Sequence, residues 1–319
     1  MAQNRSPMET SPSRFRLVIL GSAAGGGFPQ WNCRCAVCSL AWADDPRVRR
    51  RTQASIAVSA NGRDWALVNC APEILSQLQA TPALHPREGL RHSPLAAVLL
   101  TNADIDHVAG LLSLREAQPF TLTATPAVHG VLGASSAFDV LAPEMVQRRP
   151  VELGSSFDLV EGVRATIFPV PGKIALYLEA REQAEKGVLT TDMEGEQTIG
   201  VELTAGGRRV LYIPGCAAMT VSLRERLEGA DAVLFDGTLW RDDEMIRAGV
   251  GTKTGARMGH MSMSGERGSI EALRNVKVGR KIYVHINNTN PVLIDGSEER
   301  ITANKAGWEI AQDGMEIAL

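Results

Sequence analysis

This chain of 319 residues has few aromatic side chains and no surplus of basic charge. Phe, Trp and Tyr make up 5% of it, and 33 Lys and Arg side chains face 36 Asp and Glu, a formal net charge of −3. Proteins that bind nucleic acids need clustered positive charge, and those that bind single strands also need aromatic rings for stacking. The composition therefore argues against a nucleic-acid partner.

Long apolar runs are also absent. The best run, Leu95–Leu100, is as long as a strand, whereas a membrane-spanning helix needs about 20 residues. Residues 1–14 are polar, and the apolar run Leu17–Leu20 is too short for the core of a signal peptide. We therefore expect a cytoplasmic protein with no membrane segment, in which a disordered tail (residues 1–14) precedes one domain (residues 15–319).

Short aliphatic and β-branched runs alternate with turns and helical patterns along that domain. The runs predict strands over Arg16–Leu20, Ser55–Ser59, Ala66–Val68, Ala97–Leu100, Phe120–Ala124, Ala165–Pro169, Gly200–Leu203, Arg209–Ile213, Ala232–Phe235 and Lys281–His285. Helices are predicted over Ala71–Gln79, Val108–Arg115, Pro126–Leu132, Val221–Leu227 and Ser264–Arg274, with a polar surface excursion over Lys173–Gly195. This order favours a layered α/β protein with mixed sheets over a doubly wound parallel sheet.

A dinucleotide-binding fingerprint is missing, although glycines follow the first predicted strand. The segment Val18–Pro29 contains no G-x-G-x-x-G pattern, and its proline excludes a helix directly after the glycines. We interpret the glycines as a turn that lets the backbone pass close to other backbone or to a ligand.

Cysteines are few, but three of the five lie within six residues. Cys33, Cys35 and Cys38 form a C-x-C-x-x-C pattern, whose three thiolates fit one face of a tetrahedral zinc ion. The alternative is three buried thiols without a metal. We expect a closed structural zinc site that pins a loop without regular structure, and we expect Cys70 and Cys216 to be buried as small apolar side chains.

The segment Val98–Leu112 is the most informative one. A buried strand is predicted to end at Thr101 and a helix to begin at Asp106 and His107, so that polar side chains project from the turn between them. Such positions at the carboxyl end of a core strand are where α/β proteins form sites. The alternative is that Asp106 only caps the helix and His107 is an ordinary buried histidine. The residues alone leave these two interpretations about equal.

Three motifs together resemble a known family. The segment TNADIDH (101–107) is similar to the T-H-x-H-x-D-H motif of the metallo-β-lactamase superfamily, and C-x-C-x-x-C resembles that of its phosphodiesterase branch. With GSAAGGGFPQWNC (21–33) and GTKTGARMGH (251–260), the chain resembles the pyrroloquinoline quinone (PQQ) biosynthesis B proteins from about Phe15 to its end. The resemblance implies a four-layer αββα sandwich.

The resemblance also implies that one of two catalytic metal sites has been lost. Dinuclear members of the superfamily hold their first metal with three histidines, and here those positions carry Asn102, Asp104 and Gly172. The aspartate that bridges the two metals falls near Gly215. We therefore expect no first metal, with Asp104 either a ligand of the second metal or a neighbour of its ligands.

The second metal site is complete by the same comparison, with Asp106, His107 and His285 as its ligands. Two histidines and one carboxylate leave positions free on an octahedral ion, which suits mononuclear Fe(II) that binds dioxygen and substrate, although such ligands also accept zinc or copper. Asp236 is expected to orient a ligand histidine. The fourth ligand of the structural zinc would fall on Asn288, a poor zinc donor.

A glycine-rich loop, Gly249–Gly265, is expected to be mobile and to cover the site. The family implies a substrate with several carboxylates, which Lys253 and Arg257 would bind, and His260 would donate or accept a proton. The alternative for each basic residue is a solvated loop position. We interpret His85, His92 and His129 as ordinary residues.

The leading hypothesis is an iron-dependent oxygenase of PQQ biosynthesis. By resemblance it would use O2 to hydroxylate the tyrosine ring of a cross-linked Glu–Tyr dipeptide, a small-molecule PQQ precursor. One alternative is a metallo-hydrolase that cleaves a phosphodiester or peptide, and another is a soluble carrier that hands PQQ or its precursor toward the periplasm. A homo-oligomer is possible.

Overall fold

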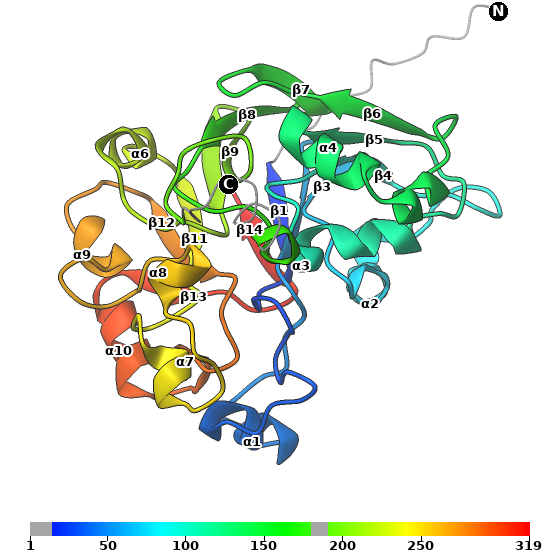
Figure 1. Ribbon diagram of the computed structural model, residues 1–319. Helices are drawn as coiled ribbons and strands as arrows, with labels where there is room; N and C mark the ends of the chain where they lie inside the picture. Colours follow the sequence, from blue (N-terminus) through cyan, green and yellow to red (C-terminus); the bar gives the residue numbers. More distant parts are fainter. Residues whose placement is uncertain (1–14, 180–190) are drawn as a thin grey trace, which may run out of the picture.

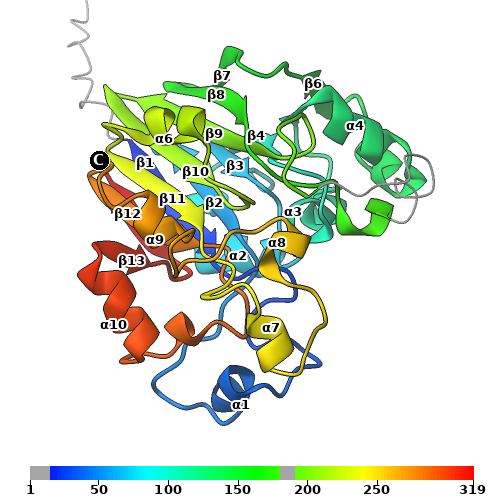
Figure 2. The same ribbon diagram turned by 60° about the vertical axis from the view of Figure 1, so that its left-hand side comes forward.

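The computed structural model describes residues 15–179 and 191–319. The predicted tail over residues 1–14 and part of the predicted surface excursion lie outside the described residues. Two mixed seven-stranded sheets stack face to face (Figures 1 and 2). None of the helices in the described ranges has the length and apolar character needed to cross a membrane.

The first sheet has the strand order β14-β1-β2-β3-β4-β5-β6. Its strands β14, β1, β2 and β3 pair antiparallel, and β3 to β6 pair parallel. The bounds are β1 Arg16–Gly21, β2 Ser55–Ser59, β3 Trp65–Val68, β4 Leu95–Leu99, β5 Phe120–Ala124, β6 Val146–Pro150 and β14 Met315–Ala318.

The second sheet has the order β13-β12-β11-β10-β9-β8-β7. Strands β7 to β10 pair antiparallel and β10 to β13 pair parallel. The bounds are β7 Ser156–Val160, β8 Val163–Pro169, β9 Ile199–Ala205, β10 Arg208–Ile213, β11 Ala232–Asp236, β12 Arg280–Val284 and β13 Trp308–Ile310.

Helices cover the outer face of each sheet. The bounds are α1 Ala36–Trp42, α2 Ile74–Ala80, α3 Ile105–Val108, α4 Pro126–Gly133, α6 Val221–Leu227, α7 Glu244–Arg247, α8 Gly255–Met258, α9 Ser269–Ala272 and α10 Glu298–Lys305. Apolar side chains of α2 and α4 pack on the first sheet, and those of α6 and α10 pack on the second.

The alternation of side chains along each strand produces this layering. In β1, Leu17 and Ile19 point into the core between the sheets, whereas Val18 and Leu20 point to the helices outside. In β10, Val210 likewise faces the inter-sheet core. Strands that are apolar on both faces need cover on both, so four layers result. The predicted αββα sandwich is confirmed.

Several element predictions are wrong in detail. The helix expected over Val108–Arg115 is instead the short α3 followed by a 3-10 helix over Ala109–Ser113, and only Ser269–Ala272 of the expected Ser264–Arg274 is helical. Strands β6, β7, β13 and β14 were not predicted, because their runs are short and all four include charged residues.

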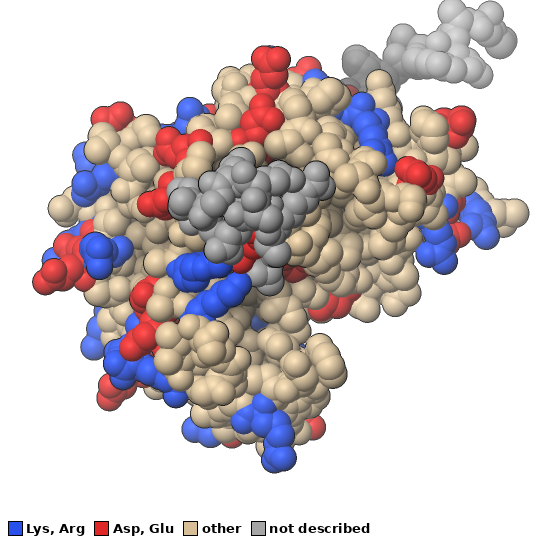
Figure 3. Space-filling view, in the orientation of Figure 1, with Lys and Arg blue, Asp and Glu red and all other residues tan. Residues whose placement is uncertain are grey.

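The two segments expected to be irregular loops both contain helix. Helix α1 follows Cys35, whose sulfur accepts a hydrogen bond from the Cys38 N–H and so caps the helix. Helix α8 lies inside the glycine-rich loop, where Thr254 caps its start and Gly259, with φ of +83°, ends it. Cys70 and Cys216 are buried, as expected. The face seen in Figure 3 carries acidic and basic side chains in a mixed pattern.

Candidate metal centre

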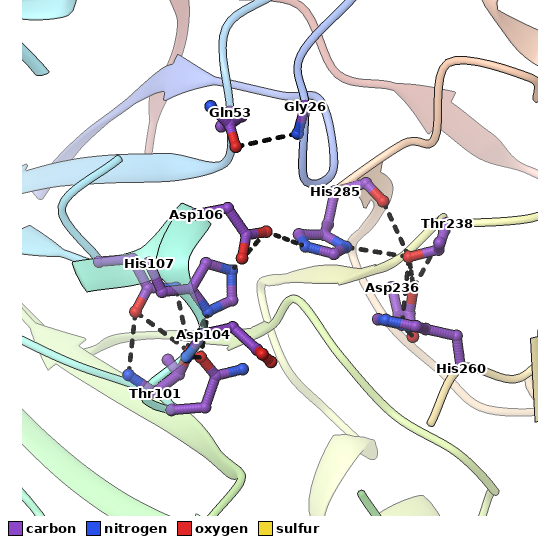
Figure 4. Close-up of polar contacts among 12 residues, drawn as sticks. Gly26, Gln53, Thr101, Asp104, Asp106, His107, Asp236, Thr238, His260 and His285 are labelled. Atoms are coloured by element: carbon purple, nitrogen blue, oxygen red, sulfur yellow. Dashed lines mark hydrogen bonds and ion pairs between the residues drawn. The ribbon is translucent and has the colours of Figure 1, made fainter. Parts of the chain in front are cut away.

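The polar side chains of the site come from loops at the carboxyl ends of parallel strands in both sheets. Asp106 and His107 lie in α3, after β4, while Asp236 ends β11 and His285 directly follows β12. Figure 4 shows these side chains pointing toward one another across the edge between the sheets. Stacking of the sheets therefore brings together residues that are 179 positions apart in the chain.

Asp106, His107 and His285 form a three-donor group, hereafter the open cluster. Their ligand atoms lie within 4.8 Å of one another. Oδ2 of Asp106 is 3.0 Å from Nε2 of His285 and 3.9 Å from Nε2 of His107. One carboxylate and two imidazoles at this separation can share one ion.

Asn102 orients His107. Nδ1 of His107 lies 2.7 Å from Oδ1 of Asn102, an oxygen that can only accept, so Nδ1 carries the proton and Nε2 carries a lone pair. That Nε2 is buried and has no hydrogen-bond partner among the described residues. Burial lowers the pKa of His107 to about 4, against the opposing charge of Asp106, so the ring is neutral at pH 7. A buried, unpaired lone pair of this kind fits a metal ligand.

Asp236 orients His285 through Thr238. The Thr238 hydroxyl donates to Oδ1 of Asp236 at 2.7 Å, and its oxygen lies 2.9 Å from Nδ1 of His285. Because a carboxylate only accepts, the proton on Nδ1 of His285 points to Thr238, and Nε2, which donates to Oδ2 of Asp106 at 3.0 Å, is the nitrogen that an ion would bind in place of its proton. His285 was predicted as the last residue of a strand, but β12 ends at Val284 and His285 has φ of +55°; such strained backbone is typical of functional positions.

Asp106 is a ligand candidate rather than the helix cap. Asp104 is the N-cap residue of α3, and Asp106 lies in the first turn with its carboxylate toward His285. Burial opposes ionisation, but His107 and a hydrogen bond from His285 outweigh it and hold the pKa of Asp106 far below its usual range. The cap interpretation of Asp106 is therefore wrong. Asp104 lines the cavity but is not in the open cluster as the described residues form it.

Asp236 also binds His260 directly. Its Oδ2 accepts from Nδ1 of His260 at 2.7 Å and from the backbone N–H of Cys216 at 2.8 Å. Burial opposes ionisation of Asp236, but the charge of His260 and its hydrogen bond outweigh it, and the pKa of Asp236 lies below its ordinary value. Asp236, His260 and His285 also have close donor atoms. We interpret this second group as a hydrogen-bond network, because Thr238 and Asp236 already engage both Nδ1 atoms.

The open cluster lies in a cavity of about 460 Å³, a size typical of small-molecule sites. Asn102, Asp104, Gly172 and Gly215, where the resemblance placed the ligands of a first metal and the bridging aspartate, all line it, and Asp104 alone among them offers a carboxylate. Glycine offers no side-chain donor, and Asn102 is engaged with His107. The geometry thus supports one ion in this cavity, held by the open cluster.

Of the two predicted substrate-binding residues, Lys253 lines this cavity and Arg257 is not among its described lining residues. The Arg257 guanidinium instead contacts the carboxylate of Glu179 at 3.1 Å. Sequence reasoning missed Glu179 and Lys173, although Lys173 directly follows Gly172. It also missed Asn102 as the residue that orients His107.

Cys33, Cys35, Cys38 and Asn288 form a second metal-site candidate, hereafter the closed cluster. The three sulfurs lie within 4.8 Å of one another, and all three cysteines are buried. Nδ2 of Asn288 is 3.2 Å from the sulfurs of Cys33 and Cys38 and 3.8 Å from that of Cys35. A 180° rotation of the amide would point its oxygen at the same three sulfurs.

The donor chemistry of the closed cluster fits zinc. Hydrogen bonding from Cys38 holds the pKa of Cys35 below its ordinary value, which favours a thiolate at this position. Three thiolates would supply three of the four ligands of a structural zinc site. Asn288 has the position of the fourth ligand.

A model of the β-lactamase superfamily domain matches residues 64–286. The chain is 57% identical over 305 residues to the coenzyme PQQ synthesis protein B of Methylorubrum extorquens (strain PA1), covering 96% of this chain and all of that protein. It is 52% identical over 307 residues to the protein of the same name from Xanthomonas oryzae pv. oryzae (strain MAFF 311018), again 96% of this chain and all of the relative.

Solved structures give the same relationship. The crystal structure of Zn²⁺-bound PqqB from Methylobacterium extorquens has a TM-score of 0.92 and 56% identity, covering 95% of this chain and all of that one. A diphosphatase from the PhnP family has a TM-score of 0.66 at 20% identity, covering 96% and 97% of the two chains. The similarity to the diphosphatase concerns the fold alone.

Proposed function

We propose that this protein is a mononuclear Fe(II)-dependent oxygenase. The proposal starts from its family: the chain belongs to the coenzyme PQQ synthesis protein B family of the β-lactamase superfamily and has a role in PQQ biosynthesis. Its substrate would be the cross-linked Glu–Tyr dipeptide, and it would hydroxylate the tyrosine ring. The single observation that carries this proposal is the open cluster, three donors that share one cavity, while the other described group of close donors there, Asp236, His260 and His285, is joined by hydrogen bonds.

The ligand set favours oxygenation over hydrolysis. Two histidines and a carboxylate leave free positions on an octahedral ion, whereas dinuclear hydrolysis needs a second ion to activate the bridging hydroxide. Fe(II) held by Asp106, His107 and His285 would supply the position at which dioxygen is bound and reduced. Ring hydroxylation adds one oxygen atom to the substrate and releases the other as water, so an external two-electron donor such as ascorbate is required.

His260 would handle the proton of the reacting ring. Its Nδ1 donates to the buried carboxylate of Asp236, so its Nε2 has a lone pair, and the ring lines the cavity. A histidine held in one tautomer by a carboxylate is suited to accept and return a proton. Asp236 thereby supports both His260 and, through Thr238, His285.

Lys253 would bind a substrate carboxylate, since its ammonium group lines the same cavity. Arg257, which was predicted to bind a substrate carboxylate too, would act through Glu179, to which its guanidinium donates a hydrogen bond. Charge-assisted hydrogen bonds of this kind both orient a carboxylate and contribute more than neutral ones.

The test is oxygen incorporation. Purified protein loaded with Fe(II) is incubated with the dipeptide, ascorbate and isotopically labelled dioxygen, and the product is analysed by mass spectrometry. We expect labelled oxygen in the ring, and we expect His107→Ala to abolish it while the control His129→Ala, on α4, leaves it unchanged. Equal product under strict anaerobiosis would contradict the oxygenase proposal.

The same samples test the alternatives. Two catalytic ions per chain besides the ion of the closed cluster, with cleavage of a phosphodiester or peptide, would support a metallo-hydrolase. Tight stoichiometric binding of PQQ without turnover would support a carrier.

A further inference from the structure

Glu179 forms ion pairs with two lysines on one wall of the cavity. Nζ of Lys173 is 3.1 Å from Oε1 of Glu179, and Nζ of Lys253 is 3.2 Å from Oε2. Both lysines line the cavity, whereas the described lining does not include Glu179, whose side chain is 9% exposed. The carboxylate is therefore a support for the lysines rather than a surface of the cavity.

Arg257 completes the charge pattern. Its Nη2 lies 3.1 Å from the same Oε2 of Glu179, so three cations converge on one carboxylate. Arg257 and Glu179 together are neutral, which leaves the two ammonium groups of Lys173 and Lys253 as an excess of two positive charges on the cavity wall. Two cations held to one carboxylate repel each other, and a ligand anion that contacts both would reduce this repulsion.

Contacts of its backbone and of its side-chain stem fix the position of Lys173. The carbonyl of Lys173 accepts a hydrogen bond from the Thr198 hydroxyl at 2.9 Å. The stem of Lys173 passes Gly259, where an added Cβ would lie 3.1 Å from its Cγ. Because Gly259 also has positive φ at the end of α8, the glycine both ends the helix and makes room for the lysine.

Glu179 stays ionised under working conditions. Burial opposes its charge, but hydrogen bonds from Arg257, Lys173 and Lys253 outweigh burial and hold the pKa of Glu179 below its ordinary value. An ammonium group has three donors, and Glu179 engages only part of this capacity in each lysine. Each lysine can therefore bind a ligand carboxylate while it remains held by Glu179.

We infer that Glu179 is a positioning residue that fixes the separation of Lys173 and Lys253, and that this pair selects ligands by the distance between two carboxylates. The inference deepens the proposed function and rests on it, because it takes the cavity as the substrate site and names dicarboxylates as the ligand class. A ligand with one carboxylate would engage one lysine, and one with the matching spacing would engage both.

A series of simple acids measures this selectivity without catalysis. Succinate, glutarate, adipate and pimelate are titrated by calorimetry into metal-loaded protein under anaerobic conditions, with propionate as the one-carboxylate reference. We expect the best diacid to bind at least about tenfold more tightly than propionate, the value of one added charge-assisted hydrogen bond. The best and worst diacids should differ by a similar factor.

Variants separate position from charge. Lys173→Met or Lys253→Met should bring the best diacid within about threefold of propionate, whereas the exposed control Lys305→Met should change nothing. Glu179→Gln should flatten the dependence on chain length, because the two lysines repel each other once the carboxylate is gone. A change of net charge alone would strengthen binding of all diacids by one factor and keep the length profile.

An unchanged length profile in Glu179→Gln, or diacids that bind no better than propionate, would overturn the inference. Should Glu179→Gln lower the unfolding temperature, Glu179→Asp keeps the charge, and it should shift the preferred chain length. Binding is measured without dioxygen, so the outcome is independent of the hydroxylation test. A clear length preference with no oxygen incorporation would refute the proposed function and leave this inference standing.

Discussion

The open and closed clusters are both metal-site candidates, but they differ in how they are built and in what they expose. The open cluster has oxygen and nitrogen donors from segments 179 residues apart, and it faces a cavity. The closed cluster has three sulfur donors within six residues and the amide of Asn288, with all its cysteines buried. The open cluster is therefore the one that a small molecule can reach, and the burial of the closed cluster is typical of a structural site.

The surroundings of the two clusters differ as well. In the open cluster each histidine is oriented by a separate polar residue, His107 by Asn102 and His285 by Thr238. In the closed cluster the cysteines are oriented by the start of α1, where the Cys35 sulfur is both a candidate metal ligand and the acceptor that caps the helix. We expect damage to the open cluster to affect function first and damage to the closed cluster to affect stability first.

Removal of an open-cluster ligand should have the largest effect. We expect His285→Ala to lose one metal ion per chain and all measurable turnover, well beyond the roughly 10- to 100-fold cost of losing an outer partner. Metal analysis by mass spectrometry should still find the ion of the closed cluster. Loss of both ions together would mean that the two clusters are not independent.

Removal of a closed-cluster sulfur should reverse this pattern. Cys38→Ser is expected to lose the zinc ion and to destabilise the fold by at least about 3 kcal/mol, because α1 is no longer held to Asn288. The unfolding temperature, measured by calorimetry, should fall while the metal content of the open cluster is kept. Cys70→Ala, a buried thiol outside both clusters, is the control and should retain both ions.

Removal of an orienting hydroxyl should have a moderate effect. Thr238→Val keeps the shape of the side chain but leaves Nδ1 of His285 and Oδ1 of Asp236 without their shared partner. We expect the affinity of the open cluster for its ion to fall roughly 10- to 100-fold, measured by competition with a chelator. Thr204→Val, on β9, is the matched control, and an equal loss there would remove the specific role of Thr238.

The effect confined to the pH dependence of stability concerns a buried acid near the closed cluster. Glu244 accepts hydrogen bonds from Thr289 and from the backbone of Trp240, and burial raises its pKa to about 7. Between its ordinary pKa and about 7 the folded protein binds more protons than the unfolded chain. The free energy of unfolding should therefore fall as the pH rises through this range, by roughly 3 kcal/mol.

The variant Glu244→Gln isolates that contribution. It should lack this part of the pH dependence, and denaturant unfolding at pH 5 and pH 8 would compare it with the native chain. Equal pH dependence in the two proteins would mean that Glu244 is not the titrating group.

The strands that position the site were predictable because their apolar runs are continuous. β2 and β5 match their predicted bounds, and β4, β11 and β12 differ by a residue or two at their ends. Edge strands such as β6 and β14 were not predictable, because their short segments become strands only when a neighbour offers hydrogen bonds.

The family resemblance of the segment around Asp106 and His107 and the spacing of the cysteines pointed to the two groups of side chains that the structure brings together. Donor type and local spacing are properties of the chain, and they restrict which ions a segment can bind. The roles of Asn102, Glu179 and Lys173 depended on contacts between distant segments. Glu179 and Lys253, for example, are 74 residues apart.

The local amino-acid sequence therefore determined which faces of the strands are apolar, which donor atoms are present and which loops carry them, because secondary-structure propensity and side-chain alternation act over a few residues. Stacking of the two sheets decided which donors meet, which nitrogen of each histidine is free, and which charges share the cavity wall. Those properties arise from distances between segments, and only a packed core sets such distances.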